Sequence, residues 1–140
     1  MENAAITSSS PDSSLRVYVV EDSAPVRERL QEMVESIAGA RCAGSAETAR
    51  AAIAGIRETS PDAVILDIRL PDGTGFDVMR ALKNHQPSPV FYVLSSFALE
   101  PYRRLAMKLG ATAFLDKVTQ LETIRELIAN HASRKPMPAH

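Results

Sequence analysis

Short apolar runs alternate along this chain with segments of helical periodicity, and this alternation is the feature that most constrains the fold. The runs cover residues 15–20, 41–45, 63–68, 90–94 and 112–115. Each is followed by a segment long enough for a helix, and apolar residues three and four positions apart give most of these segments one face to bury. The pattern predicts five βα units, which form an α/β domain with a doubly wound parallel sheet covered by helices on both faces.

Turn and capping residues agree with this division of the chain. The expected boundaries are Pro25 in a first helical turn, Gly39 and Gly110 at helix ends, and the N-terminal capping pairs Thr74 with Asp77 and Thr119 with Glu122. Residues 1–14 are rich in Ser and contain almost nothing large and apolar, so we expect a flexible tail. The segment 131–140 is expected to behave in the same way, which leaves residues 15–130 as one folded domain.

Composition bounds the class of protein. At 140 residues and 45% hydrophobic, the chain can bury one sizeable core. A formal net charge of -1 gives no general attraction to nucleic acid or to anionic membranes. No apolar stretch is long enough to span a bilayer, and the N-terminus does not resemble a signal peptide. With one cysteine, Cys42, there is no intramolecular disulfide, so we expect a soluble cytoplasmic protein.

Reactive side chains follow four of the expected strands, at the edge where parallel sheets place their binding sites. They are Glu21 and Asp22 after the first strand, Asp67 at the end of the third, Ser95 and Ser96 after the fourth and Lys117 after the fifth. Taken singly, each residue suits a helix cap, a turn or a solvated surface equally well. Their convergence on one edge favours a site.

The chemistry of such a site follows from the crowding of its carboxylates. Three neighbouring carboxylates repel one another unless one is protonated or a cation is bound. Oxygen ligands without His or thiolate suit a hard ion such as Mg²⁺. We therefore predict a phosphoryl-transfer site in which Asp67 is the nucleophile and Lys117 holds the phosphoryl oxygens. The histidines, His85, His131 and His140, lack metal-ligand spacing and are expected to be solvated.

Four segments of the sequence resemble the receiver domains of two-component response regulators. The matching motifs are VVEDSAPVRERL, VILDIRLPDGTGFDVM, VLSSFA and GATAFLDKV. They cover almost all of residues 15–130 in the order and spacing of that family. The resemblance implies a flavodoxin-like fold with strand order 2-1-3-4-5. It also implies a phosphoacceptor switch that catalyses only its own phosphorylation and dephosphorylation.

The resemblance assigns roles to individual residues. It implies phosphorylation of Asp67, direct Mg²⁺ ligation by Asp22, help from Glu21 through a water molecule, a metal ligand from the backbone carbonyl of Arg69, contacts of Ser95 and Lys117 with the phosphoryl oxygens, and a rotamer change of Phe114 on activation. The phosphoryl donor would be a sensor histidine kinase or a histidine phosphotransfer protein. The output would be contact with a downstream protein, with no direct binding of nucleic acid and no membrane insertion.

Several positions depart from the family pattern. Val118 replaces the proline that usually follows the lysine, so a cis peptide is not expected there. The first acidic residue is Glu21 where Asp is common, and Phe114 replaces the frequent Tyr or His and has no polar tip. Arg69 and Phe97 occupy positions that tune phosphoryl lifetime in the family, although both also suit an ordinary loop surface.

Three other classes of protein share part of this pattern. A dinucleotide-binding fold needs a glycine-rich turn after the first strand, where this chain has Glu21 and Asp22. Phosphatases that form a phosphoaspartate carry the nucleophile after the first strand with a second Asp two residues later, where this chain has Ala24. The remaining alternative to a stand-alone, phosphorylated receiver is a receiver-like interaction module that is not phosphorylated. The presence of Asp67 and its partner residues argues against that alternative.

Overall fold

The structure is a computed structural model that describes residues 14–135. Of the tails expected at residues 1–14 and 131–140, residues 1–13 and 136–140 lie outside the described residues. The main strands are β2 (Leu15–Val20), β3 (Ala40–Ala46), β4 (Ala63–Asp67), β7 (Val90–Ser95) and β8 (Ala113–Asp116). The helices are α2 (Ala24–Glu35), α3 (Ala49–Thr59), α4 (Gly75–Ala81), α5 (Glu100–Lys108) and α6 (Leu121–Arg134). Each main strand overlaps one of the apolar runs in the sequence.

The five main strands form one parallel sheet in the order β3-β2-β4-β7-β8. Counted along the chain, this is the order 2-1-3-4-5, so the predicted flavodoxin-like topology is confirmed. From β2 the chain continues to β3 on one side of β2, and the next strand, β4, pairs with the other side of β2. The direction of strand order therefore changes at β2. This reversal leaves a crevice at the carboxyl ends of β2 and β4, where open α/β sheets place their sites.

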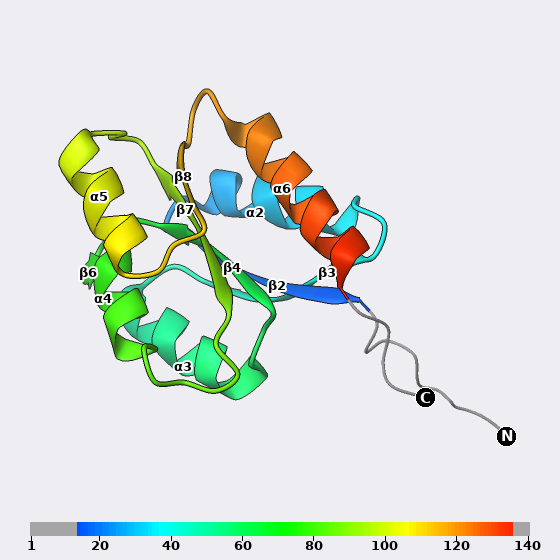
Figure 1. Ribbon diagram of the computed structural model, residues 1–140, viewed down its shortest axis with the longest axis horizontal. Coiled ribbons are helices and arrows are strands. Elements are labelled where there is room, and N and C mark those ends of the chain that lie inside the picture. Colours follow the sequence, from blue (N-terminus) through cyan, green and yellow to red (C-terminus); the bar gives the residue numbers. More distant parts are fainter. Residues whose placement is uncertain (1–13, 136–140) are drawn as a thin grey trace, which may run out of the picture.

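Helices cover both faces of the sheet (Figure 1). Helices α2 and α6 lie on one face, and α3, α4 and α5 lie on the other. Every residue of the central strand β4 is buried, which explains why its sequence is a continuous apolar run that ends in Asp67. The two apolar layers position the strand ends, and the candidate site residues extend from those ends.

Helix boundaries follow the sequence in part. Thr74 and Asp77 form the predicted capping box at the start of α4, and Pro25 lies in the first turn of α2. The pair Thr119 and Glu122 was a wrong prediction, since α6 begins without a side-chain cap. Instead, Asp116 Oδ1 accepts the backbone N–H groups of Val118 and Thr119, at 2.8 and 3.0 Å. The Thr119 backbone is thereby held in a turn before the helix begins.

The predicted C-terminal boundary was also wrong, because α6 continues to Arg134. The reason is that residues at the end of the helix contact residues far away in the sequence. The half-buried His131 accepts or donates a hydrogen bond through Nδ1 to the Tyr92 hydroxyl of β7, at 2.9 Å. Lys135 Nζ, just beyond the helix, lies 2.9 Å from Asp62 Oδ2. These contacts order residues that have little helical pattern of their own, and they place His131 against the sheet rather than in solvent.

A small antiparallel hairpin was not predicted. It pairs β5 (Arg69–Leu70) with β6 (Gly73–Thr74) directly after β4. Strands of two residues are too short to show any periodicity in sequence. The hairpin turns the chain back so that α4 begins beside the end of β4. In the part of the chain that the structure describes, no helix is long and apolar enough to cross a membrane.

Candidate functional site

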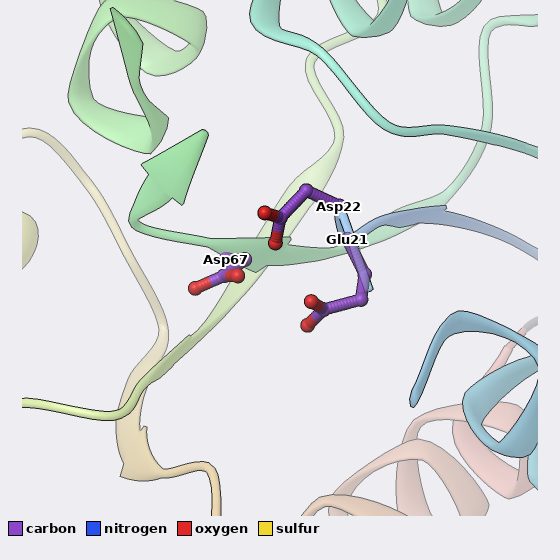
Figure 2. A group of neighbouring side chains, drawn as sticks. All are labelled: Glu21, Asp22 and Asp67. Carbon is purple, nitrogen blue, oxygen red and sulfur yellow. The ribbon is translucent and has the colours of Figure 1, made fainter. Parts of the chain in front are cut away.

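The carboxyl ends of four strands bring together the side chains singled out in the sequence. Glu21 and Asp22 follow β2, Asp67 ends β4, Ser95 ends β7 and Lys117 follows β8. Since β4 lies between β2 and β7 in the sheet, Asp67 occupies the middle of this row. Figure 2 shows the carboxylates of Glu21, Asp22 and Asp67 converging from the ends of the two neighbouring strands.

The acidic group has the donor set of a hard-cation site. Glu21, Asp22 and Asp67 each offer one carboxylate oxygen, and these oxygens lie within 4.8 Å of one another. Glu21 and Asp67 are buried, whereas Asp22 is exposed. Oxygen donors with one side open to solvent fit Mg²⁺, which keeps part of its water shell in proteins. Asp22 and Asp67 are best placed for this role, because Lys117 contacts both carboxylate oxygens of Glu21 but only Oδ2 of Asp67.

Lys117 lies between the two buried carboxylates. Its Nζ donates to Asp67 Oδ2 at 3.0 Å and to Glu21 at 3.1 Å (Oε1) and 3.3 Å (Oε2). The backbone N–H of Ser23 donates to Glu21 Oε2 at 3.0 Å, which fixes the Glu21 side chain further. The ammonium group therefore offsets part of the repulsion between carboxylates that was predicted from the sequence, and it does so beside Asp67.

The pKa values of Glu21 and Lys117 are shifted by burial and by charge. Burial raises the pKa of Glu21, and the nearby charge of Asp67 adds to the effect, although the Ser23 N–H and Lys117 oppose it. Burial lowers the pKa of Lys117, but hydrogen bonds and charges from Asp67 and Glu21 more than offset this, so its pKa is raised. Lys117 is thus held in its charged form beside Asp67.

Ser95 is buried at the end of β7 but does not contact Asp67 through any hydrogen bond of the structure. Its hydroxyl donates to the Phe97 carbonyl at 2.9 Å and accepts from the Phe97 N–H at 3.0 Å. The Phe97 ring is exposed and lies 4.9 Å from the guanidinium carbon of Arg69. The Ser95 hydroxyl is thus hydrogen-bonded within its own loop.

The remaining predicted positions lie around this core. The backbone N–H of Arg69 is 3.4 Å from Asp67 Oδ1, which places the Arg69 backbone beside the carboxylate. Phe114 is buried, and the Arg103 guanidinium lies 5.5 Å from its ring centroid and donates to its backbone carbonyl at 3.2 Å. As the sequence predicted, the Lys117–Val118 peptide is not cis, since Gln86–Pro87 is the one cis bond among residues 14–135.

Gly75 is a site residue that the sequence analysis missed. A Cβ atom at this position would lie 2.6 Å from the backbone oxygen of Asp67 and 3.1 Å from Leu66 Cγ. The Gly75 N–H also donates to the carbonyl of Ile68 at 2.8 Å. Glycine therefore lets α4 begin directly against the end of β4. The available indication in the sequence was a glycine immediately after the capping residue Thr74, where other residues form better helices.

Comparison with known proteins identifies the class of protein that this fold and site define. The sequence profile of the response regulator receiver domain family matches residues 17–129. The chain therefore belongs to the response regulator receiver domain family of two-component systems.

Two curated relatives are bacterial enzymes with a similar segment. The chain is 35% identical over 114 residues to protein-glutamate methylesterase/protein-glutamine glutaminase 5 of Myxococcus xanthus, covering 81% of this chain and 33% of that protein. It is 36% identical over 112 residues to the corresponding protein 1 of Oleidesulfovibrio alaskensis, covering 79% of this chain and 30% of that protein. The chain thus spans about a third of the length of the curated relatives that it matches.

Solved structures show the same fold. The non-phosphorylated receiver domain of HemR from Leptospira biflexa is 30% identical, with a TM-score of 0.72 over 89% of this chain and 98% of that one. The response regulator domain of CheB from Thermotoga maritima has a TM-score of 0.76 over 89% of this chain and 99% of that one. At 22% identity, the second likeness concerns the fold alone.

Proposed function

We propose that this receiver domain accepts a phosphoryl group on Asp67, in a Mg²⁺-dependent reaction, from a phosphohistidine of a sensor histidine kinase or a histidine phosphotransfer protein. One observation carries the proposal: the buried Asp67 carboxylate lies against the Lys117 ammonium, 3.0 Å away, and beside the exposed carboxylate of Asp22. A nucleophile, a fixed positive charge and a cation ligand thus meet at one open edge.

The residues of the chain divide the chemistry as follows. An Asp67 oxygen forms a bond to phosphorus, the P–N bond of the donor breaks, and the released imidazole nitrogen takes up a proton from solvent. Lys117 then holds a phosphoryl oxygen as a point charge. Mg²⁺, when bound by Asp22, Asp67 and the carbonyl of Arg69, supplies the charge that offsets repulsion between phosphoryl and carboxylate oxygens. The domain transforms no other substrate in this proposal.

Signalling follows from a change of contacts at the same edge. Phosphorylation draws Ser95 and Lys117 toward the phosphoryl oxygens, and Phe114 moves into the space that Ser95 leaves. Leu99 is 54% exposed and Val118 is 78% exposed, which places apolar side chains on the face formed by α5, β8 and α6. A downstream protein binds this face in the phosphorylated state, and neither nucleic acid nor a membrane is part of the proposed output. The proposed location is the cytoplasm.

Intact mass spectrometry with acetyl phosphate and Mg²⁺ tests phosphoryl acceptance. The wild-type protein should gain one phosphoryl mass, and Asp67→Asn should gain none while keeping its fold. Asp77→Asn is a matched control. Asp77 lies outside the cluster of Glu21, Asp22 and Asp67, and an asparagine at this position can still cap α4. Titration with Mg²⁺ followed by NMR should show weak binding that Asp22→Ala removes. Phosphorylation of the Asp67 variant at the wild-type rate would refute the assignment.

The alternative function is a receiver-like interaction module that is never phosphorylated. The same experiment separates the two, since such a module would gain no mass from acetyl phosphate even in the wild-type form. The buried and paired state of Asp67 and Lys117 favours the phosphorylated switch, because an interaction module has no need to keep two carboxylates and an ammonium together inside the sheet edge.

A further inference from the structure

A groove between α4 and α5 lies outside the phosphoacceptor site. It has a volume of about 360 Å³ and is lined by Met79, Arg80, Lys83, Lys108 and Leu109. Met79 is buried in the core, and Leu109 is partly buried against the same apolar layer. The floor of the groove is thus apolar and continuous with the core, and the charged side chains lie along its rim.

The rim carries positive charge with no carboxylate among the lining residues. Lys83 and Lys108 are exposed, and the described part of the chain gives neither of them an ion pair. Arg80 lies 3.6 Å from Asp77, but both side chains are 54% exposed, so the pair is weak. Arg104 precedes Lys108 by one helical turn and adds a cation on that side.

The local charge contrasts with that of the whole chain, which is nearly neutral at -1. A lysine near each helix C-terminus would by itself be explained by the helix dipole. The helix dipole does not explain why the C-terminal ends of α4 and α5 both lie beside this apolar groove. A concave apolar surface with a rim of one charge is the arrangement of a binding site for a complementary partner.

We propose that this groove binds an acidic segment of a partner protein, with one aliphatic or aromatic side chain on the Met79 and Leu109 floor and flanking carboxylates on Lys83 and Lys108. Nucleic acid fits less well, because no aromatic residue lines the groove for base stacking. A second copy of the chain fits less well too, because two copies that met groove to groove would bring their positive rims together.

Binding of an acidic segment in the groove does not require phosphorylation of Asp67. The groove lies on the exposed ends of α4 and α5, and the unphosphorylated structure already presents its lysines to solvent. If the protein gained no phosphoryl mass, peptide binding in the groove would still be expected. If the peptide did not bind, phosphorylation of Asp67 would still be expected.

The test is an NMR titration of the full chain with the blocked peptide acetyl-Glu-Glu-Leu-Phe-Glu-Glu-amide. Backbone shifts should concentrate at residues 79–83 and 105–109. The double variant Lys83→Glu with Lys108→Glu should weaken binding about tenfold or more, as expected when two exposed charge contacts are reversed. The charge-conserving variant Lys83→Arg with Lys108→Arg should bind within about twofold of wild type. The matched control Arg41→Glu, on β3, should leave binding unchanged.

Other results would overturn the proposal. Equal binding of a peptide in which Ser replaces Leu and Phe would mean that charge alone acts and that the apolar floor is not used. Binding of an oligothymidylate at the same groove with equal affinity would replace the protein partner by a polyanion. A concentration-dependent oligomer in sedimentation, removed by the double variant, would replace it by a second copy. Shifts outside the groove, or equal loss in Arg41→Glu, would also reject it.

Discussion

Replacing Lys117 by alanine should destabilise the domain by about 3 kcal/mol at neutral pH, because it leaves two buried carboxylates without a counter-charge. Lys117 Nζ has three carboxylate contacts between 3.0 and 3.3 Å. Breaking a buried ion pair by removing one partner costs about 3–5 kcal/mol. Since the Lys117 side chain keeps 16% of its exposure, the lower end of that range applies. A typical domain stability of about 5–15 kcal/mol would leave the variant folded.

The loss should shrink as pH falls. Burial raises the pKa of Glu21, and Lys117 partly offsets this rise. Removal of Lys117 should therefore raise the pKa of Glu21 further. A carboxyl group with a higher pKa in the folded than in the unfolded state takes up its proton first in the native protein. The variant therefore gains stability, relative to wild type, as pH falls from the raised pKa of Glu21 in the folded state toward its ordinary value of 4.5. In wild type, the stability linked to the raised pKa of Lys117 is fully present below its unfolded value of 10.5.

Urea unfolding of both proteins at about pH 8 and about pH 5.5 measures this difference. The expected result is a smaller gap between variant and wild type at the lower pH. Added Mg²⁺ should stabilise the variant, because a cation on Asp22 and Asp67 replaces part of the lost charge. Lys83→Ala serves as a control and should stay within about 0.5 kcal/mol of wild type. A loss for Lys117→Ala below about 1 kcal/mol, or one independent of pH, would refute the reasoning.

Three further predictions concern neighbouring features. Gly75→Ala should lower the free energy of unfolding by about 2 kcal/mol or more, because its Cβ would overlap the Asp67 backbone oxygen, and an unchanged urea midpoint would contradict this. Burial lowers the pKa of His131 below 6.5, so wild-type stability should fall as pH drops through 6.5 toward that lower value. His131→Gln should flatten this part of the melting-temperature profile, and an unaltered slope would exclude His131 as its source. Ser95→Ala should still be phosphorylated but should show only part of the NMR shifts that beryllofluoride induces over residues 99–115. The reason is that each charged hydrogen bond contributes about 1.5–3 kcal/mol, whereas a full switch between the two states takes about 5.5 kcal/mol. Full wild-type shifts in that variant would show that Ser95 does not couple the site to the face.

The fold could be predicted because its determinants are local and repeated. The run ending at Asp67 is apolar throughout, and burial on both faces requires nothing else of a central strand. The positions of Glu21, Asp67, Ser95 and Lys117 followed from the same pattern, since parallel strands bring their carboxyl ends to one edge whatever the details of packing.

The limits of the prediction lie where an individual contact, distant or local, overrides the pattern of a segment. Helix α6 extends past residue 130 because His131 meets Tyr92, a partner 39 positions away. The capping pair at Thr119 failed because Asp116 already holds the backbone before the helix. Neither contact leaves a periodic pattern in the sequence, so local propensity could not reveal it.

The sequence by itself determined the class of fold, the edge of the sheet that carries the site and the residue types that meet there, because periodicity and strand direction are properties of short segments. Only the tertiary structure decided how those residues pair. It placed Lys117 between Glu21 and Asp67, left Asp22 exposed and turned Ser95 toward Phe97. Such choices depend on distances of a few ångströms between separate strands, and electrostatic interactions in a partly buried site change steeply over those distances.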